Sequence, residues 1–296
     1  MSQERATYPR LMIEAGGCTI GDAMTVAHTA IRKTIGRVGK LFLAMVVALG
    51  FTVGGDFSLE ARQAVFGQRQ IQFYVPYSGS TPVYLPAVLL VAHNAGNQQE
   101  TAQRALHHQA MGMEIDVRLV NGVLYATHSS PSSYVPLRAW QAPRLREAWA
   151  YSADATVLKL DLKSTGEKAL LQLVQFIQAR PTEQQIILVS KNHDALIMLD
   201  VALPNTLQFL SLSNGAEIDE LLLKDGRVEG VDGISIPAWA LTSERILALK
   251  EHGYAIDAWT VNDVERLVEL ASLGVDSVTT DNLAFFDMAV ETPGEH

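Results

Sequence analysis

The chain has 296 residues, of which 48% are hydrophobic and 19% charged, and its formal net charge is −9. This length suits one large α/β domain with a short appendage. Residues 1–40 carry six Lys/Arg against three Asp/Glu, which leaves a net charge of −12 for the rest of the chain. An acidic body without a basic stripe argues against nucleic acid as a partner, and a single cysteine, Cys18, excludes an internal disulfide framework.

The first distinctive segment is an uncharged apolar stretch, residues 41–55, that follows a cluster of basic residues. It is shorter than the roughly 20 residues that a membrane-spanning helix needs. The basic flank places residues 1–40 in the cytoplasm or in a pre-sequence. Three interpretations stay open: the hydrophobic region of a signal peptide cleaved near Gly55, an uncleaved membrane anchor, and a buried helix. The first two predict an extracytoplasmic protein, either secreted or attached to a membrane through residues 41–55.

Residues 56–86 contain Pro, Gly and Ser and are interpreted as a linker. From residue 87 to residue 290 the pattern becomes regular, with helix-like segments between most of a series of strand-length apolar runs. The strand-like runs are AVLLVAHN, GMEIDVRLV, VLYATHS, TVLKLDLKS, QIILVSKN, TLQFLSLSN, DGISIPA, YAIDAWTV and DSVTTDN. Many of the helix-like segments end at a Gly, the residue preferred at a helix C-terminus.

This alternation predicts a parallel sheet with right-handed crossovers. About eight such units fit a closed (β/α)₈ TIM barrel, preceded by the N-terminal hydrophobic signal or anchor segment. An open doubly wound sheet is the alternative. No Gly-rich phosphate loop follows the first strand, which argues against a nucleotide-binding dehydrogenase.

In such barrels the catalytic groups project from the C-terminal ends of the strands, and several polar residues occupy such positions. His93 closes the first strand-like run, and His128 closes the third. Glu114 and Asp116 are two residues apart on a strand and therefore face the same side. Asp161 alternates with leucines in VLKLDLKS, so its side chain is expected on the inner face. The sequence therefore predicts a site built from two histidines and three carboxylates.

Three carboxylates at one barrel mouth repel one another, so a divalent cation or the neighbouring Lys159 and Lys163 must compensate their charge. Oxygen-only ligands favour a hard cation, Mg²⁺ or Ca²⁺. The histidines are then free to act as general acid and general base on opposite sides of a phosphorus atom. Each of these residues also has an ordinary structural interpretation, and it is their conjunction at strand ends that favours a catalytic site.

Five motifs resemble the glycerophosphodiester phosphodiesterase family: AHNAGNQQET, GMEIDV, ATHSS, DAWTVND and GVDSVTTDN, between residues 92 and 282. The resemblance implies a (β/α)₈ barrel that hydrolyses glycerophosphodiesters with a divalent cation. By position, His93 and His128 correspond to the acid/base pair, and Glu114, Asp116 and Asp161 to the metal ligands. Trp259 corresponds to a wall of the pocket.

Three positions depart from the family pattern. Asn94 stands where members usually have a phosphate-binding Arg, Ser129 where they have Asp, and Asp161 where they have Glu. Some features resemble two related groups on the same barrel, the sphingomyelinase D and lysophospholipase D toxins and the menorin-like proteins. In the toxin group, attack by a substrate hydroxyl gives a cyclic phosphate.

The main hypothesis is therefore an extracytoplasmic, metal-dependent phosphodiesterase acting on glycerophosphodiesters or lysophospholipid head groups. Asn94, Lys163, Lys191 and Trp259 are the expected substrate-binding or phosphate-binding residues. The alternative is a catalytically silent barrel that acts as an extracytoplasmic binding protein, an idea motivated by Asn94 and Ser129. A gain in melting temperature on cation binding would distinguish the two.

Overall fold

The computed structural model describes residues 71–73, 88–131, 141–224 and 227–291, with the backbone alone for 71–73 and 289–291. The expected hydrophobic segment at residues 41–55 and Cys18 lie outside the described residues. No helix in the described part of the chain is long and apolar enough to cross a membrane.

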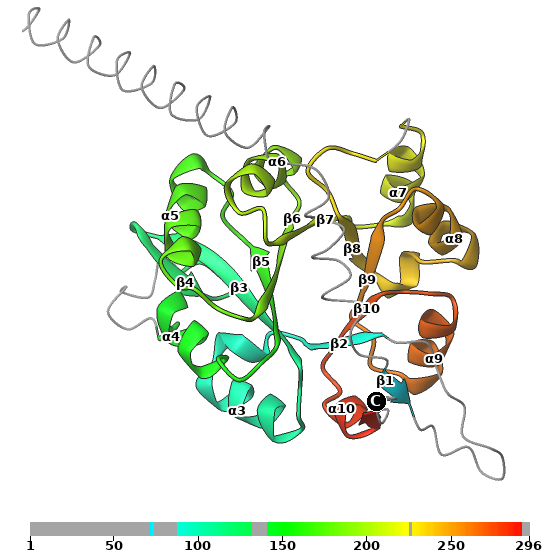
Figure 1. Ribbon diagram of the computed structural model, residues 1–296, viewed down its shortest axis with the longest axis horizontal. Helices are drawn as coiled ribbons and strands as arrows, with labels where there is room; N and C mark the ends of the chain where they lie inside the picture. Colours follow the sequence, from blue (N-terminus) through cyan, green and yellow to red (C-terminus); the bar gives the residue numbers. More distant parts are fainter. Residues whose placement is uncertain (1–70, 74–87, 132–140, 225–226, 292–296) are drawn as a thin grey trace, which may run out of the picture. The chain divides into compact units, whose positions relative to one another are not determined.

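Eight parallel strands close into a ring, with helices around its outside (Figure 1). The ring is closed because β2 pairs with β10 on one side and with β3 on the other. In chain order the strands are β2 (Leu89–Ala92), β3 (Gly112–Val120), β5 (Val157–Leu162), β6 (Gln185–Ser190), β7 (Leu207–Ser211), β8 (Gly233–Pro237), β9 (Ala255–Trp259) and β10 (Ser277–Thr280). The expected (β/α)₈ TIM barrel is confirmed, and the open sheet is excluded.

Two further pairings lie outside this ring. β4 (Val123–Ala126) runs antiparallel to β3, and β1 (Ile71–Phe73) runs antiparallel to β11 (Ala289–Glu291). All nine strand-like runs of the sequence therefore form strands, but the third of them, β4, is not a barrel strand. The interpretation of His128 as the end of a barrel strand is wrong, because β4 returns along β3 as the second arm of a hairpin.

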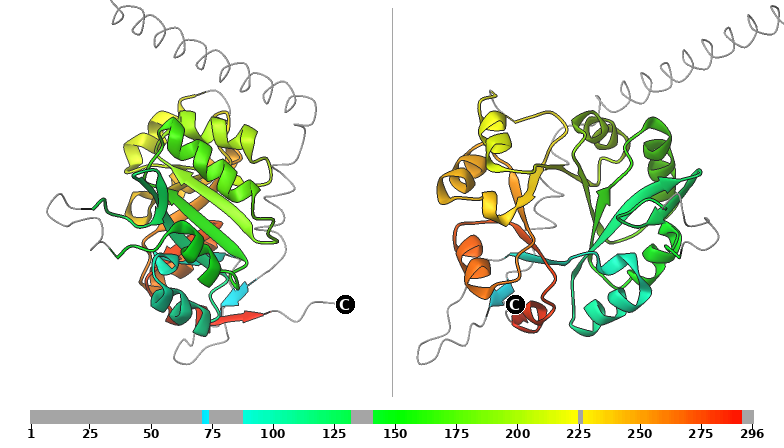
Figure 2. Two further views of the ribbon diagram at one scale, coloured as in Figure 1. Left: turned by 90° about the vertical axis from the view of Figure 1, so that its left-hand side faces the viewer. Right: turned by 180° about the vertical axis from the view of Figure 1, so that it is seen from behind.

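The helices lie between the strands and cover the outside of the ring, as the view from behind also shows (Figure 2). They are α3 (Gln99–His107), α4 (Leu145–Tyr151), α5 (Glu167–Gln178), α6 (His193–Ala202), α7 (Gly215–Leu222), α8 (Ser243–Glu251), α9 (Val264–Ser272) and α10 (Ala284–Asp287). There are two short 3₁₀ helices: η3 (Ala238–Ala240) directly follows β8, and η1 (Ala95–Asn97) follows β2 after His93 and Asn94.

Local sequence sets where several of these helices begin and end. Asn192, Asn214, Thr242 and Asp263 precede α6, α7, α8 and α9, and each side chain accepts a hydrogen bond from a backbone N–H of the first turn. Gly253 and Gly274 follow α8 and α9 with φ of 77° and 87°, which is the left-handed conformation that favours glycine.

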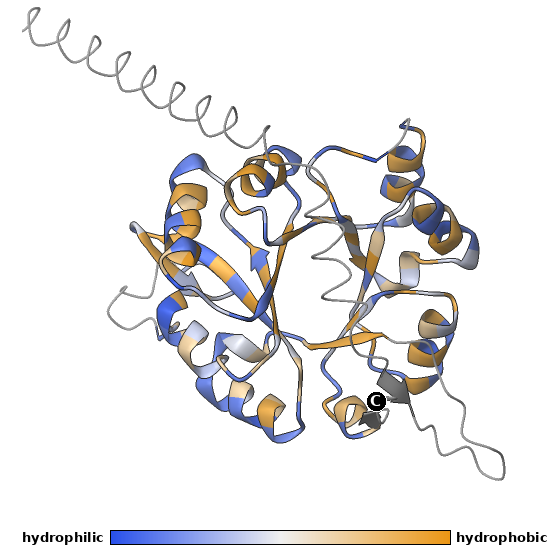
Figure 3. Cartoon of the chain, in the orientation of Figure 1, coloured by the Kyte–Doolittle hydropathy of each residue, from blue (hydrophilic) through white to orange (hydrophobic). Residues whose placement is uncertain are grey.

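The strands separate two apolar regions. Leucines such as Leu158, Leu160 and Leu162 of β5 point outward and join the core between the sheet and the helices. A smaller cluster fills the inside of the barrel near the strand beginnings, and it comprises Leu89, Val91, Val157, Ile187, Val189, Leu207, Phe209 and Ala255. β2 is hydrophobic along its whole length, whereas the outer helices alternate between hydrophobic and hydrophilic residues (Figure 3).

One glycine makes the inner packing possible. A Cβ at Gly233 would lie 2.5 Å from the ring of Phe209, so only glycine leaves room for this ring in the barrel. Above this apolar layer, the inner positions of the strands become polar, and there the candidate site lies.

Candidate functional site

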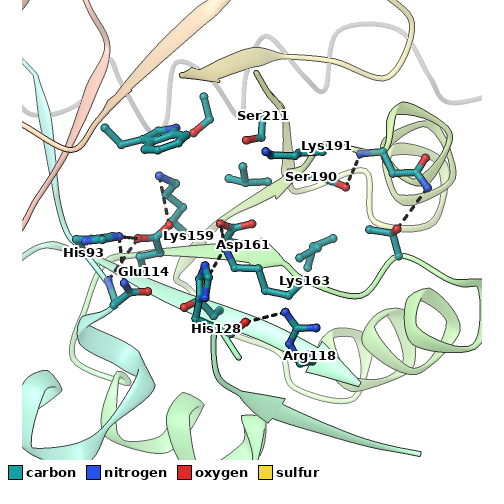
Figure 4. Close-up of a pocket in the computed structure, with 18 of the residues that line it drawn as sticks. His93, Glu114, Arg118, His128, Lys159, Asp161, Lys163, Ser190, Lys191 and Ser211 are labelled. Carbon is teal, nitrogen blue, oxygen red and sulfur yellow. Dashed lines mark hydrogen bonds and ion pairs between the residues drawn. The ribbon is translucent and has the colours of Figure 1, made fainter. Parts of the chain in front are cut away.

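A pocket of about 790 Å³ opens at the C-terminal ends of the barrel strands (Figure 4). The structure brings every site residue expected from the sequence to this one pocket: His93, Asn94, Glu114, Asp116, His128, Asp161, Lys163, Lys191 and Trp259. They come from β3, β5 and β9 and from the loops that follow β2, β4, β5 and β6, so tertiary structure unites residues up to 166 positions apart.

His93 directly follows β2, and its imidazole is held at both nitrogen atoms. Nδ1 lies 2.7 Å from a carboxylate oxygen of Asp281, which can only accept, so Nδ1 carries the proton. Nε2 then accepts a hydrogen bond from the Asn94 amide at 3.0 Å. Nε2 is also 3.7 Å from the carboxylate of Glu114. This arrangement presents a basic nitrogen to the pocket, as a general base requires.

Asn94 has a structural role that its sequence position did not reveal. Its backbone is left-handed, with φ of 54°, a conformation that asparagine adopts more readily than most residues. Its amide oxygen accepts a hydrogen bond from Asn97, which also donates to Asp116 at 2.7 Å. Asn94 therefore links the imidazole of His93 to the carboxylate of Asp116 through Asn97.

Asp281 stands at the end of β10 and is fixed by Asn262. The Asn262 amide donates to the second carboxylate oxygen of Asp281 and accepts from its backbone N–H, at 3.0 and 2.8 Å. Partial burial raises the pKa of Asp281, but the hydrogen bonds from Asn262 and His93 outweigh this effect and the net shift is downward. Asp281 is thus an ionised partner that orients His93.

Asp281 was not among the site residues expected from the sequence. It belongs to the GVDSVTTDN motif, and its place directly after a strand is the signal that could have identified it.

The three carboxylates lie beside two lysine ammonium groups. β3 and β5 pair in parallel with Asp116 opposite Asp161 and Glu114 opposite Lys159. The Lys163 ammonium contacts Asp161 at 2.5 Å and Asp116 at 3.0 Å. Lysines therefore compensate much of the repulsion that the sequence implied.

Glu114 is the least well compensated of these groups. It is only 5% exposed. Burial raises its pKa, and Lys159 offsets this shift only in part. The nearest contact to a lysine is 3.6 Å, from Lys159, compared with 2.5 Å for Asp161. An additional positive charge near Glu114 would therefore be stabilising.

Lys159 is buried below the pocket and connects it to the barrel interior. Its ammonium donates to Asp257 at 2.7 Å and to Thr279 at 2.8 Å. Asp257 also accepts hydrogen bonds from Ser235 and Ser277. Burial alone would lower the pKa of Lys159, but Asp257 and Glu114 raise it, and the net shift is upward. This satisfied polar layer supports the floor of the pocket.

His128 reaches the pocket because β3 extends beyond the level of the pocket and the antiparallel strand β4 then returns toward it. β4 pairs Ala126 with Val117, and the backbone N–H of Thr127 donates to Asp116 O at 2.9 Å. The return strand thus brings His128 to the level of Asp116. The Arg118 guanidinium holds this loop through the His128 carbonyl at 2.6 Å and the Ser130 hydroxyl at 3.1 Å.

The chemistry of the donor set fits a hard divalent cation. Glu114, Asp116, Asp161 and Asp257 carry four negative charges, against two positive charges on Lys159 and Lys163, and oxygen-only donors suit Mg²⁺ or Ca²⁺. Within the described residues, however, no group of three or more His, Cys, Asp or Glu side chains is arranged to hold a metal ion. Lys163 contacts both Asp116 and Asp161, so a cation bound by both would have to displace its ammonium group.

Fold and site together define the class of protein: a TIM barrel whose mouth carries two histidines, carboxylates and lysines. Residues 154–284 match the model of the Glycerophosphoryl diester phosphodiesterase family. This region, which includes Asp161, Lys163 and Trp259, is similar to that family, and the resemblance inferred from the sequence motifs is confirmed. The expected enzyme class, a glycerophosphodiester phosphodiesterase-like phosphoric diester hydrolase, is confirmed with it. Members of the family generally use a divalent cation.

Solved structures of similar proteins share the fold. A phosphodiesterase from Oleispira antarctica, in complex with the product sn-glycerol-3-phosphate, is 20% identical with a TM-score of 0.57, and the match covers 69% of this chain and 96% of that one. Glycerophosphodiester phosphodiesterases from Thermotoga maritima and Parabacteroides distasonis are 19% and 20% identical, with TM-scores of 0.53 and 0.55. These matches cover 68% of this chain in both cases, and 97% and 95% of the other chains. No match was found among curated protein sequences.

Proposed function

We propose that this protein is a divalent-cation-dependent phosphodiesterase that cleaves glycerophosphodiesters or lysophospholipid head groups, with His93 and His128 as its acid/base pair. The observation that carries the proposal is the orientation of His93. Asp281 fixes its protonated Nδ1, so Nε2 is the basic nitrogen of the ring, and a substrate that enters the pocket beside His128 would replace the Asn94 amide as its hydrogen-bond donor. With a phosphodiester between the two imidazoles, one imidazole can take the proton of the water or substrate hydroxyl that attacks phosphorus. The other can donate a proton to the leaving alcohol oxygen as its bond to phosphorus breaks.

The remaining side chains are assigned to binding and charge. Glu114, Asp116 and Asp161 would hold Mg²⁺ or Ca²⁺, which supplies stabilisation of the charge on the phosphoryl oxygens. Lys163 and the Asn94 amide would bind the phosphate, Lys191 would contact the substrate elsewhere in the pocket, and Trp259 would form a wall of the pocket. The product bound in the Oleispira antarctica structure, sn-glycerol-3-phosphate, supports a small phosphodiester as the substrate.

Turnover of defined substrates tests this proposal. The purified full-length protein is incubated with glycerophosphocholine and with lysophosphatidylcholine, with and without chelator. His93→Ala and His128→Ala are each expected to lower kcat by about 10²- to 10⁴-fold. His107→Ala, at an exposed position on α3, is the matched control and keeps full activity. Full activity in either pocket variant contradicts the acid/base assignment, and turnover that persists in chelator contradicts the cation requirement.

Cation binding can be tested without a substrate. Mg²⁺ or Ca²⁺ should raise the melting temperature of the wild-type protein, and Glu114→Gln should reduce that gain. A catalytically silent binding barrel predicts no such stabilisation. If the stabilisation occurs and no phosphodiester is cleaved, the substrate rather than the site is wrongly assigned.

We further propose an extracytoplasmic location, secreted or attached to a membrane through residues 41–55. The basic flank and apolar composition of that segment support this proposal. The mass of the mature protein, together with cell fractionation, distinguishes cleavage near Gly55 from an uncleaved anchor. Recovery of the complete chain in the cytoplasmic fraction contradicts both.

A further inference from the structure

The pocket has a second end, away from the two histidines. It is built from the loops and strand ends of β5, β6 and β7 (Figure 4). We call it the polar arm, and it comprises Thr165, Ser190, Lys191, Asn192, His193, Asp194 and Ser211. Each of these side chains offers a hydrogen-bonding group, and together they offer three hydroxyls, one amide, one imidazole, one carboxylate and one ammonium.

Lys191 supplies the positive charge of the polar arm. Its ammonium donates to the hydroxyl of Ser213 at 3.1 Å. No carboxylate in the described part of the chain forms an ion pair with it, whereas Lys159 and Lys163 are both paired with carboxylates. Lys191 therefore has donors left for an anion that enters the arm.

Two further groups in the arm have free hydrogen-bonding capacity. The Ser211 hydroxyl has no hydrogen-bond partner among the described residues, although it lines the pocket. His193 donates from Nε2 to the carbonyl of Glu229 at 2.8 Å, which leaves Nδ1 as an acceptor in the neutral ring. A ligand with several hydroxyls can donate a hydrogen bond to Nδ1 of His193 and accept one from the Ser211 hydroxyl.

Asn192 organises the arm. Its side chain donates to Thr165 at 3.3 Å and accepts from the first turn of α6, and its backbone N–H donates to Ser190 at 3.0 Å. The hydroxyls of Thr165 and Ser190 are thus held in place by the strand end and the helix cap before any ligand binds.

Within the part of the chain that the structure describes, this pocket has few hydrophobic side chains and no cage of aromatic rings. Among the described lining residues, only Leu162, Val189 and Trp259 are hydrophobic. A long acyl chain gains affinity from apolar surface. A quaternary ammonium group is held by a cage of aromatic rings, and Trp259 is a single ring.

On this basis, and resting on the function proposed above, we infer that the polar arm binds a hydroxyl-rich, negatively charged alcohol group of the diester, such as a polyol phosphate. It thereby selects against choline and against an acyl chain. Lys191 then contacts the charge on this alcohol group rather than the phosphate that is cleaved.

A comparison of two soluble diesters tests the inference. Glycerophosphoglycerol phosphate carries an anionic polyol, and glycerophosphocholine carries a cationic alcohol of similar size. The wild-type protein should cleave the first with a kcat/KM at least about tenfold higher, as expected for a hydrogen bond to a charged group. Lys191→Met should reduce this ratio by at least about tenfold. Lys224→Met, the same substitution at an exposed lysine outside the pocket, should leave the ratio unchanged.

The outcomes separate this inference from the proposed function. If Lys191→Met lowers kcat/KM equally for both diesters, Lys191 binds the reacting phosphate and the inference is overturned. A wild-type preference for glycerophosphocholine also overturns it. If neither diester is cleaved, the proposed function fails. Calorimetry of the two diesters with the wild-type and Lys191→Met proteins then tests the arm by itself: tighter binding of glycerophosphoglycerol phosphate that depends on Lys191 supports the inference, and its absence overturns it.

Discussion

The carboxylate of Asp281, at the end of β10, lies 2.7 Å from Nδ1 of His93, at the end of β2, although the two residues are 188 positions apart in the chain. β2 and β10 are neighbouring parallel strands, with Ala92 opposite Thr280. The register of this pair therefore places the two side chains that follow the strands next to each other.

Replacement of Asp281 should impair catalysis more than substrate binding. Asp281→Ala leaves the Nδ1 proton of His93 without its acceptor, so the ring loses its fixed orientation and tautomer. We expect kcat to fall by about 10²-fold, with a smaller change in KM. The control is Asp287→Ala, since Asp287 accepts an equivalent hydrogen bond from His108 outside the pocket. Equal losses in the two variants would contradict the role of Asp281 as a positioning residue.

Arg118 should act through His128. Its guanidinium holds the His128 carbonyl and the Ser130 hydroxyl, so Arg118→Met frees the loop that carries the imidazole. We expect kcat to fall by about tenfold or more through misplacement of His128. In the double variant with His128→Ala, the loss should not exceed that of His128→Ala alone. Additive losses, or an equal loss in the exposed-site control Arg104→Met, would show that Arg118 acts in another way.

Removal of the Lys163 charge should strengthen cation binding. Its ammonium contacts both Asp116 and Asp161, and a cation that binds both carboxylates competes with it. Lys163→Met is expected to lower the dissociation constant for Mg²⁺ or Ca²⁺ by at least about tenfold, because two carboxylates lose a positive neighbour. Calorimetric titration measures the effect, and Lys168→Met, at an exposed position on α5, is the control. Unchanged or weaker cation binding would show that the cation does not use both carboxylates.

The buried pair of Lys159 and Asp257 should contribute strongly to stability. Lys159→Met leaves Asp257 as an uncompensated charge that is 1% exposed. We expect the free energy of unfolding to fall by about 3–5 kcal/mol, as measured by urea denaturation at neutral pH. The double variant Lys159→Met/Asp257→Asn should recover part of this loss, since the buried side chain at position 257 then carries no charge. A double variant as unstable as the single one would contradict this explanation.

The same pair predicts a pH dependence. Burial by itself would raise the pKa of Asp257, but the Lys159 ammonium and the hydroxyls of Ser235 and Ser277 lower it overall. A lowered carboxyl pKa contributes stability above the unfolded value of about 3.9, and this contribution is lost as the pH falls below it. Asp257→Asn should therefore show a shallower loss of stability below about pH 4. Urea denaturation at several pH values measures the effect. If the free energy of unfolding of Asp257→Asn falls with acid as steeply as that of the wild type, Asp257 is not the source of this pH dependence.

Sequence patterns predicted much of the fold because strand periodicity and helix capping are local properties. The nine strand-like runs all form strands, and the ends of α8 and α9 coincide with their glycines. The hairpin of β3 and β4 was not recognised, because an apolar run does not reveal which neighbour it pairs with or in which direction. His128 was correctly expected near the carboxylates, but for the wrong reason.

The sequence by itself determined which chemical groups are available and which of them follow strands: His93, Glu114, Asp116 and Asp161 all lie at inner or terminal strand positions. Only the tertiary structure decided how these groups are paired. Barrel closure placed Asp281 on His93, the register of β3 and β5 placed Lys163 between two carboxylates, and the return of β4 placed His128 at the level of Asp116. Local periodicity sets the face on which a side chain lies, whereas strand register and closure, which depend on residues far apart in the chain, set which side chain it meets.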